Sequence, residues 1–165
     1  MSVRAFIGIG SNLGDRAARC KQAVEQLAAL SETRLIRSSA WVQTAPAEGA
    51  EGGPFLNGVA ELETTLTPRR LVMALQQVEA ALGRPPAHRP GAARSIDLDL
   101  LLYGDLVLRE PDLVIPHPRM AVRRFVLAPL AAIAPEARHP VLGRTAAELL
   151  RDLDSKPAAP SEAAA

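Results

Sequence analysis

The chain of 165 residues is short of cysteine, aromatic residues and long apolar runs. Cys20 is alone, so no intrachain disulfide can form, and a reducing compartment is expected. One Trp, one Tyr and three Phe, with a formal net charge of +1, argue against a protein that binds nucleic acid or an acidic membrane surface. No apolar run approaches the roughly 18 residues of a membrane span, and glycines break the start too early for a signal peptide. We expect a cytoplasmic protein.

Lysine is also scarce. Among 19 basic residues only Lys21 and Lys156 are lysine, and the rest are arginine. The planar guanidinium group suits phosphate, so any phosphate site in this chain has to be built from arginine. The same count also fits simple drift in a chain rich in alanine and arginine, and the count alone does not decide between the two.

The length fits one domain with a real core. We expect this domain over residues 1–154 and a disordered tail over 155–165, which has nothing to bury. Hydrophobic periodicity predicts the main strands and helices in the order β-α-β-β-α-β. That order indicates an α+β fold, a ferredoxin-like α/β plait with a mainly antiparallel sheet and helices packed on it. The predicted strands are Val3–Ile9, Thr33–Thr44, Phe55–Thr65 and Ser95–Tyr103, with short ones at 106–108 and 113–115, and the predicted helices begin near Asp15, Thr67, Phe125 and Thr145.

The glycine-rich segment Gly8–Gly14 follows the first strand and precedes the first helix. It fits neither the dinucleotide fingerprint nor the phosphate loop that ends in Gly-Lys-Ser/Thr. We therefore interpret it as a tight turn with a helix cap, which ends the first strand.

Two aspartates provide the sharpest chemical signal. Asp97 and Asp99 are two apart on a predicted strand, so their side chains share one face, while Ile96, Leu98 and Leu100 face the core. Adjacent carboxylates next to phosphates are a typical Mg²⁺ site. A solvated acidic face is the alternative, because Asp-x-Asp alone is a weak motif.

Arginines in two segments of the chain form a second candidate site, one that would bind phosphate. Guanidinium groups that converge on phosphates can neutralise the charge that develops during transfer. The alternative is that they are solvated surface arginines, which we favour for Arg119 and Arg124. The two segments hold Arg84, Arg89 and Arg94 in the first and, after His117, Arg119, Arg123 and Arg124 in the second.

Phe55 and Asn57 share a strand face after a loop with three glycines and two prolines. A phenyl ring can stack on a flat heterocycle, and an amide offers one donor and one acceptor edge to it. Phe125 could supply the other side of a sandwich. A core phenylalanine beside an incidental asparagine fits these residues equally well.

Taken together, these motifs resemble the 6-hydroxymethyl-7,8-dihydropterin pyrophosphokinases of folate biosynthesis. The resemblance runs from about residue 3 to residue 153. It rests on Gly10-Ser-Asn-Leu-Gly-Asp15, Phe55-Leu-Asn57, Glu79 with Gly83-Arg84, Arg94-Ser-Ile-Asp-Leu-Asp99, Ile115-Pro-His117 and Arg123-Arg-Phe-Val-Leu-Ala-Pro-Leu130. The order and spacing of these motifs together are more specific than any one of them.

The resemblance implies a reaction in which the pterin hydroxyl attacks the β-phosphorus of ATP and releases AMP. It implies that Asp97 and Asp99 hold two Mg²⁺ ions on ATP, and that both act in catalysis with Arg84 and Arg94. It further implies pterin contacts for Thr44, Phe55, Asn57 and Phe125, and nucleotide contacts for Gln76, Arg84, Arg94, His117 and Arg123. We expect a monomer that acts on these small molecules, with the loops 45–54 and 84–94 mobile until both substrates bind.

Two positions depart from the family pattern. The stretch Pro90–Arg94 lacks the tryptophan and the preceding arginine that the family usually shows. Arg89 lies one position away from where that arginine is expected and could supply the missing charge. Ala45 occupies a position where proline is common.

Two other functions compete with this interpretation. RNA-binding domains share the same order of elements and stack bases on sheet aromatics, but the chain lacks their aromatic signature. A metal-dependent phosphohydrolase or nuclease would use Asp97 and Asp99 with water as the nucleophile. The pair Phe55 and Asn57 favours a pterin site over that second alternative.

Overall fold

The computed structural model describes residues 1–12, 14–44, 54–83 and 96–156. No helix within these ranges has the length and apolar character to cross a bilayer. The elements in chain order are β1 (Val3–Ser11), α1 (Arg16–Ala28), β2 (Thr33–Ser38), β3 (Val42–Thr44), β4 (Phe55–Thr64), α2 (Pro68–Ala81), β5 (Asp97–Tyr103), β6 (Leu108–Glu110), β7 (Leu113–Ile115), the 3₁₀ turn η1 (Met120–Val122), α3 (Arg124–Ile133) and α4 (Ala146–Asp154).

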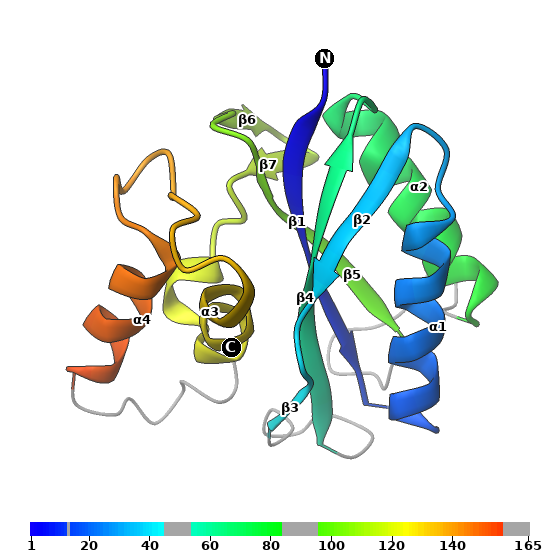
Figure 1. Cartoon of the computed structure of the whole chain (residues 1–165), viewed down its shortest axis with the longest axis horizontal. Coiled ribbons are helices and arrows are strands. Elements are labelled where there is room, and N and C mark those ends of the chain that lie inside the picture. The colour runs from blue at the N-terminus through cyan, green and yellow to red at the C-terminus, as the bar shows by residue number, and fades with distance from the viewer. Residues whose placement is uncertain (13, 45–53, 84–95, 157–165) are drawn as a thin grey trace.

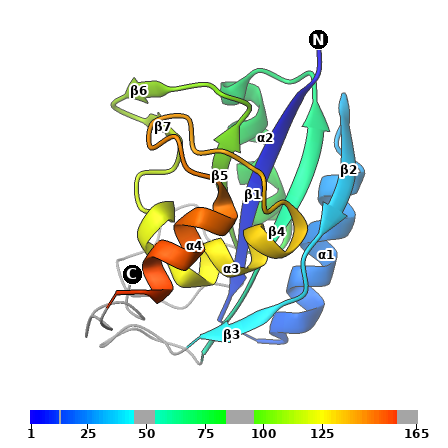
Figure 2. The same cartoon turned by 60° about the vertical axis from the view of Figure 1, so that its left-hand side comes forward.

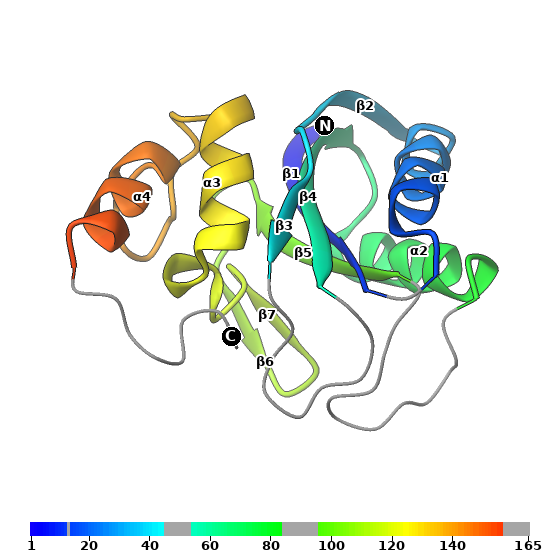
Figure 3. The same cartoon turned by 90° about the horizontal axis from the view of Figure 1, so that it is seen from below.

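A five-stranded antiparallel sheet forms the middle of the molecule. Its strand order is β2-β4-β1-β5, and β3 pairs with the beginning of β4. Helices α1 and α2 lie on one side of the sheet and α3 and α4 on the other, so the described chain has three layers (Figures 1 and 3). The predicted α+β plait is therefore confirmed, with α3 and α4 as an additional layer.

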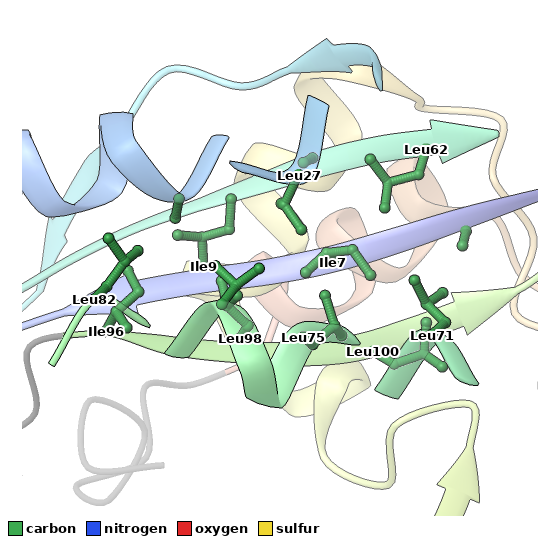
Figure 4. Packing of buried hydrophobic residues seen from close by; sticks show 14 of the residues in the cluster. Ile7, Ile9, Leu27, Leu62, Leu71, Leu75, Leu82, Ile96, Leu98 and Leu100 are labelled. Carbon is green, nitrogen blue, oxygen red and sulfur yellow. The ribbon is translucent and has the colours of Figure 1, made fainter. Parts of the chain in front are cut away.

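The first core lies between the sheet and α1–α2 (Figure 4). Side chains alternate across a strand, so Ile7 and Ile9 of β1 and Leu62 of β4 all reach this layer. They meet Leu27 of α1 and Leu75 of α2 there.

The second core lies between the opposite face of the sheet and α3–α4, which Figure 2 shows in front of the strands. Phe6 of β1 and Val59 of β4 pack in it against Leu130 of α3. The register between β1 and β5 shifts by one residue here, because Phe6 pairs with Leu102 whereas Ile7 pairs with Leu100. The irregularity leaves Leu101 without a partner residue on β1, and Leu101 and Leu102 both belong to this second core.

Local signals set the helix ends as the sequence predicts. Thr67 caps α2 by accepting a hydrogen bond from the N–H of Arg70, and Pro68 occupies the first helical position. Gly83 follows the helix with a φ of 97°, a conformation that favours glycine. The helical spacing of Ala17, Cys20, Val24 and Leu27 predicts the buried face of α1. This prediction is partly wrong, since Ala17 is exposed and Ala23 is buried instead.

Several strand boundaries differ from the prediction. The strand predicted over Thr33–Thr44 is divided into β2 and β3, and β4 ends at Thr64 rather than Thr65. Strand β1 does not end at the glycines: it continues to Ser11, because Gly8 and Gly10 pair on both sides, with β4 and with β5. Strand β5 begins at Asp97, and Ser95 lies outside the described residues. Strand β6 begins at Leu108 rather than at 106.

Candidate active site

Asp97 and Asp99 lie on the sheet face that α3 and α4 cover. Both are half-buried at the beginning of β5, where they pair with Gly10 and Gly8 of β1. Leu98 between them packs into the first core, on the other side of the sheet. The predicted alternation of this strand is therefore confirmed, and the two carboxylates share one face.

Gly10 connects the aspartates to the candidate pterin residues. On one side it pairs with Asp97 of β5, and on the other with Asn57 of β4. Neighbouring strands are about 4.8 Å apart, so the backbones of Asp97 and Asn57 are separated by about 10 Å. Because glycine has no side chain, neighbouring side chains can lie over this part of the sheet face.

The amide of Asn57 has a fixed orientation. This side chain is 7% exposed, and its Nδ2 donates a hydrogen bond to Oγ1 of Thr44 at 3.0 Å. Thr44 is paired with Phe55 between β3 and β4. A β-carbon at Gly10 would lie 3.0 Å from Oδ1 of Asn57 and 3.7 Å from Cδ1 of Phe55. The phenyl ring and the amide therefore lie side by side over Gly10, as the pterin prediction requires.

Arg123 and Phe125 approach from the beginning of α3, which packs against β3 and β4. The guanidinium carbon of Arg123 lies 5.6 Å from the centre of the Phe125 ring, a cation–π contact. Burial and the charge of Arg119 lower the pKa of Arg123, while the carboxylates of Asp99 and Asp97 raise it. The charge of Arg123 is thus close enough to act on both aspartates.

His117 lies near the same carboxylates. The backbone N–H of His117 donates a hydrogen bond to the carbonyl of Leu101 at 2.9 Å, which holds the turn after β7 against β5. Its Nδ1 accepts a hydrogen bond from the N–H of Arg119 at 3.2 Å. Burial and the charge of Arg123 lower the pKa of His117 to about 4, although Asp97 opposes this effect. The ring is neutral at physiological pH.

The structure does not group every predicted residue with these. Gln76 is exposed on α2, the helix layer opposite to α3, so its contact with the nucleotide stays a prediction. Arg84, Arg89 and Arg94 lie outside the described residues, as do the loops that we expect to close. Arg124 is exposed and pairs with Asp154, with 2.8 Å between Nε and Oδ1, which agrees with the surface role expected for it.

Sequence reasoning missed two features. Arg119 was expected to be a surface residue without a role; its side chain is exposed, yet its charge lowers the pKa of both His117 and Arg123. Gly10 was interpreted as part of a turn, although it is the strand residue between Asp97 and Asn57. Its position two residues from Gly8, in alternation along a strand, was the available signal.

Comparison with known proteins decides the family. A model of the 7,8-dihydro-6-hydroxymethylpterin-pyrophosphokinase (HPPK) family matches residues 6–135. The chain belongs to this family. The family prediction from the motifs is confirmed, and both competing interpretations, the RNA-binding domain and the phosphohydrolase, are set aside.

Bacterial relatives support the assignment over nearly the whole chain. A 2-amino-4-hydroxy-6-hydroxymethyldihydropteridine pyrophosphokinase of Methylorubrum extorquens is 42% identical over 151 residues, which is 92% of this chain and 94% of the relative. The protein of the same name from Pseudomonas aeruginosa is 41% identical over 150 residues, 91% of either chain.

Solved structures confirm the fold. A crystal structure of Plasmodium falciparum HPPK-DHPS with pteroate matches 92% of this HPPK chain with a TM-score of 0.71 and 15% identity. Another, with pterin and p-hydroxybenzoate, gives the same TM-score and identity. This chain spans 42% and 43% of those longer chains, respectively.

Proposed function

We propose that this HPPK transfers the terminal pyrophosphoryl group of ATP to the hydroxyl of 6-hydroxymethyl-7,8-dihydropterin, in folate biosynthesis. The row Asp97–Gly10–Asn57 across three strands carries the proposal. It sets two carboxylates and an ordered amide on one face of the sheet, with about 10 Å between the backbones of Asp97 and Asn57 and a glycine between them. That spacing suits a metal-bound phosphate chain at one end and a flat ring at the other.

The donor set fits Mg²⁺ that arrives with ATP. Within the described ranges no group of three or more His, Cys, Asp or Glu side chains is arranged to hold a metal ion. Mg²⁺ is usually held by one or two carboxylates together with phosphate oxygens and water, so Asp97 and Asp99 are sufficient. We propose two ions there, each of which would screen phosphate charge and orient the transferred group when bound.

Arg123 and His117 would hold the phosphate chain. The Nε of Arg123 is buried and has no hydrogen-bond partner among the described residues, which is costly unless a ligand supplies one. A phosphate oxygen is a suitable acceptor for this group. His117, neutral because of its lowered pKa, can donate a hydrogen bond from its second nitrogen without adding charge. Arg84 and Arg94 are proposed to join them.

The pterin ring would bind over Gly10. Nδ2 of Asn57 donates a hydrogen bond to Thr44. This bond fixes the amide, and its Oδ1 can accept a hydrogen bond from a ring N–H of the pterin. Phe55 lies beside it, and Phe125 enters from α3, which packs on the same strands. We propose that the two phenyl rings sandwich the pterin, with Thr44 at its edge. Gln76 is proposed to contact the nucleotide.

In the transfer, the pterin oxygen forms a bond to the β-phosphorus, the bond from that phosphorus to the α-phosphate oxygen breaks, and the hydroxyl proton is released. The chain contributes by placing the hydroxyl in line and by opposing the developing negative charge with fixed cations. No covalent enzyme intermediate is required. We further propose one domain over residues 1–154, working as a monomer in the cytoplasm; all the proposed site residues lie within this range.

The direct test of the reaction is product analysis. The protein is incubated with ATP, Mg²⁺ and 6-hydroxymethyl-7,8-dihydropterin, and the nucleotides are separated by chromatography. The proposal requires AMP and pterin pyrophosphate in a one-to-one ratio. ADP as the main product, or equal ATP consumption without pterin, would contradict it.

A further inference from the structure

Strand β5 is the outermost strand on its side of the main sheet, as far as the described residues show. Asp97 and Asp99 pair with Gly10 and Gly8 of β1. Successive N–H groups of an antiparallel strand point to opposite edges. Leu98 lies opposite Ile9 of β1, and its backbone N–H points away from β1 toward α2. An edge N–H in a protein interior needs another acceptor.

Glu79 of α2 supplies that acceptor. Its Oε2 accepts the hydrogen bond from the N–H of Leu98 at 2.7 Å. The Glu79 side chain is 8% exposed, and α2 packs along β5 in the first core. A carboxylate makes a shorter and stronger hydrogen bond than a neutral carbonyl oxygen. The contact therefore fixes the one residue that lies between the two aspartates.

Packing alone does not call for a carboxylate at this position. Leu71, Leu75 and Val78 already attach α2 to the sheet, and an apolar residue after Val78 would extend that contact. Burying a carboxylate carries a large desolvation cost that specific hydrogen bonds must offset. Through its hydrogen bond to Leu98, this carboxylate contacts the strand that carries the candidate metal site.

We propose that Glu79 is a positioning residue for Asp97 and Asp99. Its hydrogen bond to Leu98 holds the edge of β5 that faces away from β1, so the two carboxylates stay at the spacing that the metal-bound phosphates need. The inference rests on the proposed function, since it assigns Glu79 a role through those two aspartates. Partners of this indirect kind change metal affinity by about 10- to 100-fold when they are removed.

Three substitutions separate the hydrogen bond from the charge. Glu79→Gln keeps an oxygen at the same reach and removes the charge, whereas Glu79→Asp keeps the charge and withdraws the oxygen by about 1.5 Å. Glu79→Leu removes both and keeps the volume. If the bond matters, Gln retains turnover within about threefold of wild type, while Asp and Leu lower kcat by roughly 10- to 100-fold.

Two measurements accompany kcat. Amide hydrogen exchange of Leu98, followed by NMR in the ligand-free protein, reports the bond itself and should speed up in the Asp and Leu variants alone. Titration of Mg²⁺ at saturating ATP and pterin reports the metal site. The Mg²⁺ concentration for half-maximal activity should rise by about tenfold in the same two variants.

Glu61 offers a matched control. It is also buried, at 5% exposure, on the central strand β4, where Arg4 and Arg37 pair with it. Glu61→Gln removes a comparable buried charge far along the sheet from Asp97, since Glu61 pairs with Phe6 of β1. This variant should lose stability and keep both kcat and the Mg²⁺ requirement of the wild type.

The outcomes are distinguishable. Faster exchange at Leu98 with unchanged kcat and Mg²⁺ requirement would show that Glu79 only closes the strand edge, which overturns the inference. A lower kcat in Glu79→Gln with an unchanged kcat in Glu79→Asp would assign the effect to the charge of Glu79, which also overturns the inference. The Asp variant keeps the inference testable if the Leu variant does not fold. Failure of the proposed function appears separately and in the wild type, as ADP in place of AMP or as ATP consumption that does not need pterin.

Discussion

Oδ1 of Asn57 lies 3.0 Å from the point where a β-carbon on Gly10 would stand. A methyl group at Gly10 therefore has to displace the amide that we assign to the pterin. A β-carbon added at Gly8, two residues away on the same face, would lie 3.4 Å from Cδ2 of Leu101, an ordinary contact with a flexible side chain. The two glycines form a matched pair for mutation.

We expect Gly10→Ala to raise KM for the pterin by roughly 10-fold, the scale at which one methyl group changes recognition in a tight pocket. KM for ATP should change far less. Gly8→Ala serves as the control and should stay within about threefold of wild type. Steady-state kinetics with each substrate varied in turn measures this difference. Equal effects of the two substitutions would mean that the contact with Asn57 does not matter.

Replacing Asp97 or Asp99 by Ala should leave a folded protein whose turnover is lower by roughly 1,000-fold or more. Both side chains are only half-buried, so their loss creates no large core defect. Asp112→Ala is the control, because Asp112 is exposed and pairs with Arg69 at the β6–β7 turn. Activity above about one tenth of wild type at saturating Mg²⁺ in either Asp97 or Asp99 variant would exclude the two-aspartate site.

Arg123 and Arg124 are neighbours with opposite expectations. Arg123→Ala removes a half-buried cation that acts on the aspartates and should lower kcat/KM by about 100-fold or more. Arg123→Lys should restore part of it, because lysine keeps the charge without the planar fork of donors. Arg124→Ala breaks a surface pair with Asp154 and should stay near wild type. Similar losses in both alanine variants would contradict the assignment.

The lowered pKa of His117, about 4, has a consequence for stability. In the unfolded chain this ring takes up a proton near pH 6.5. Between pH 6.5 and pH 4 the unfolded state therefore binds more protons, so stability decreases as the pH falls through this window. His117→Asn, whose amide oxygen can replace Nδ1, should remove a pH-dependent loss on the order of 1–3 kcal/mol. Denaturant unfolding across this pH range measures it, and an NMR titration that gives His117 a pKa of 6.5 or more in the ligand-free protein would contradict it.

The sequence predicted the sheet and much of the site because both depend on alternation along strands. Asp97 and Asp99 had to share a face once Leu98 and Leu100 faced the core, and the structure places them so. The same argument placed Asn57 beside Phe55. These relationships lie within one strand and need no knowledge of its neighbours.

The errors concern features that depend on neighbouring strands. Gly8 and Gly10 look like the end of a strand when only the local sequence is considered, but pairing with β4 and β5 on both sides extends β1 past them. The lack of a partner residue on β1 for Leu101, the charge of Arg119 beside His117 and the bond from Leu98 to Glu79 likewise arise from tertiary contacts. Local propensity carries no information on such contacts.

The central claim is that Asp97 and Asp99 hold the metal ions of ATP while the pterin lies over Gly10. A crystal of the protein with Mn²⁺, a non-hydrolysable ATP analogue and hydroxymethylpterin, measured at the manganese absorption edge, tests it most directly. We predict two anomalous peaks within coordination distance of the two aspartates, about 2.0–2.2 Å, and a pterin ring between Phe55 and Phe125. Manganese bound by phosphates alone, or a pterin located away from Asn57, would contradict the account.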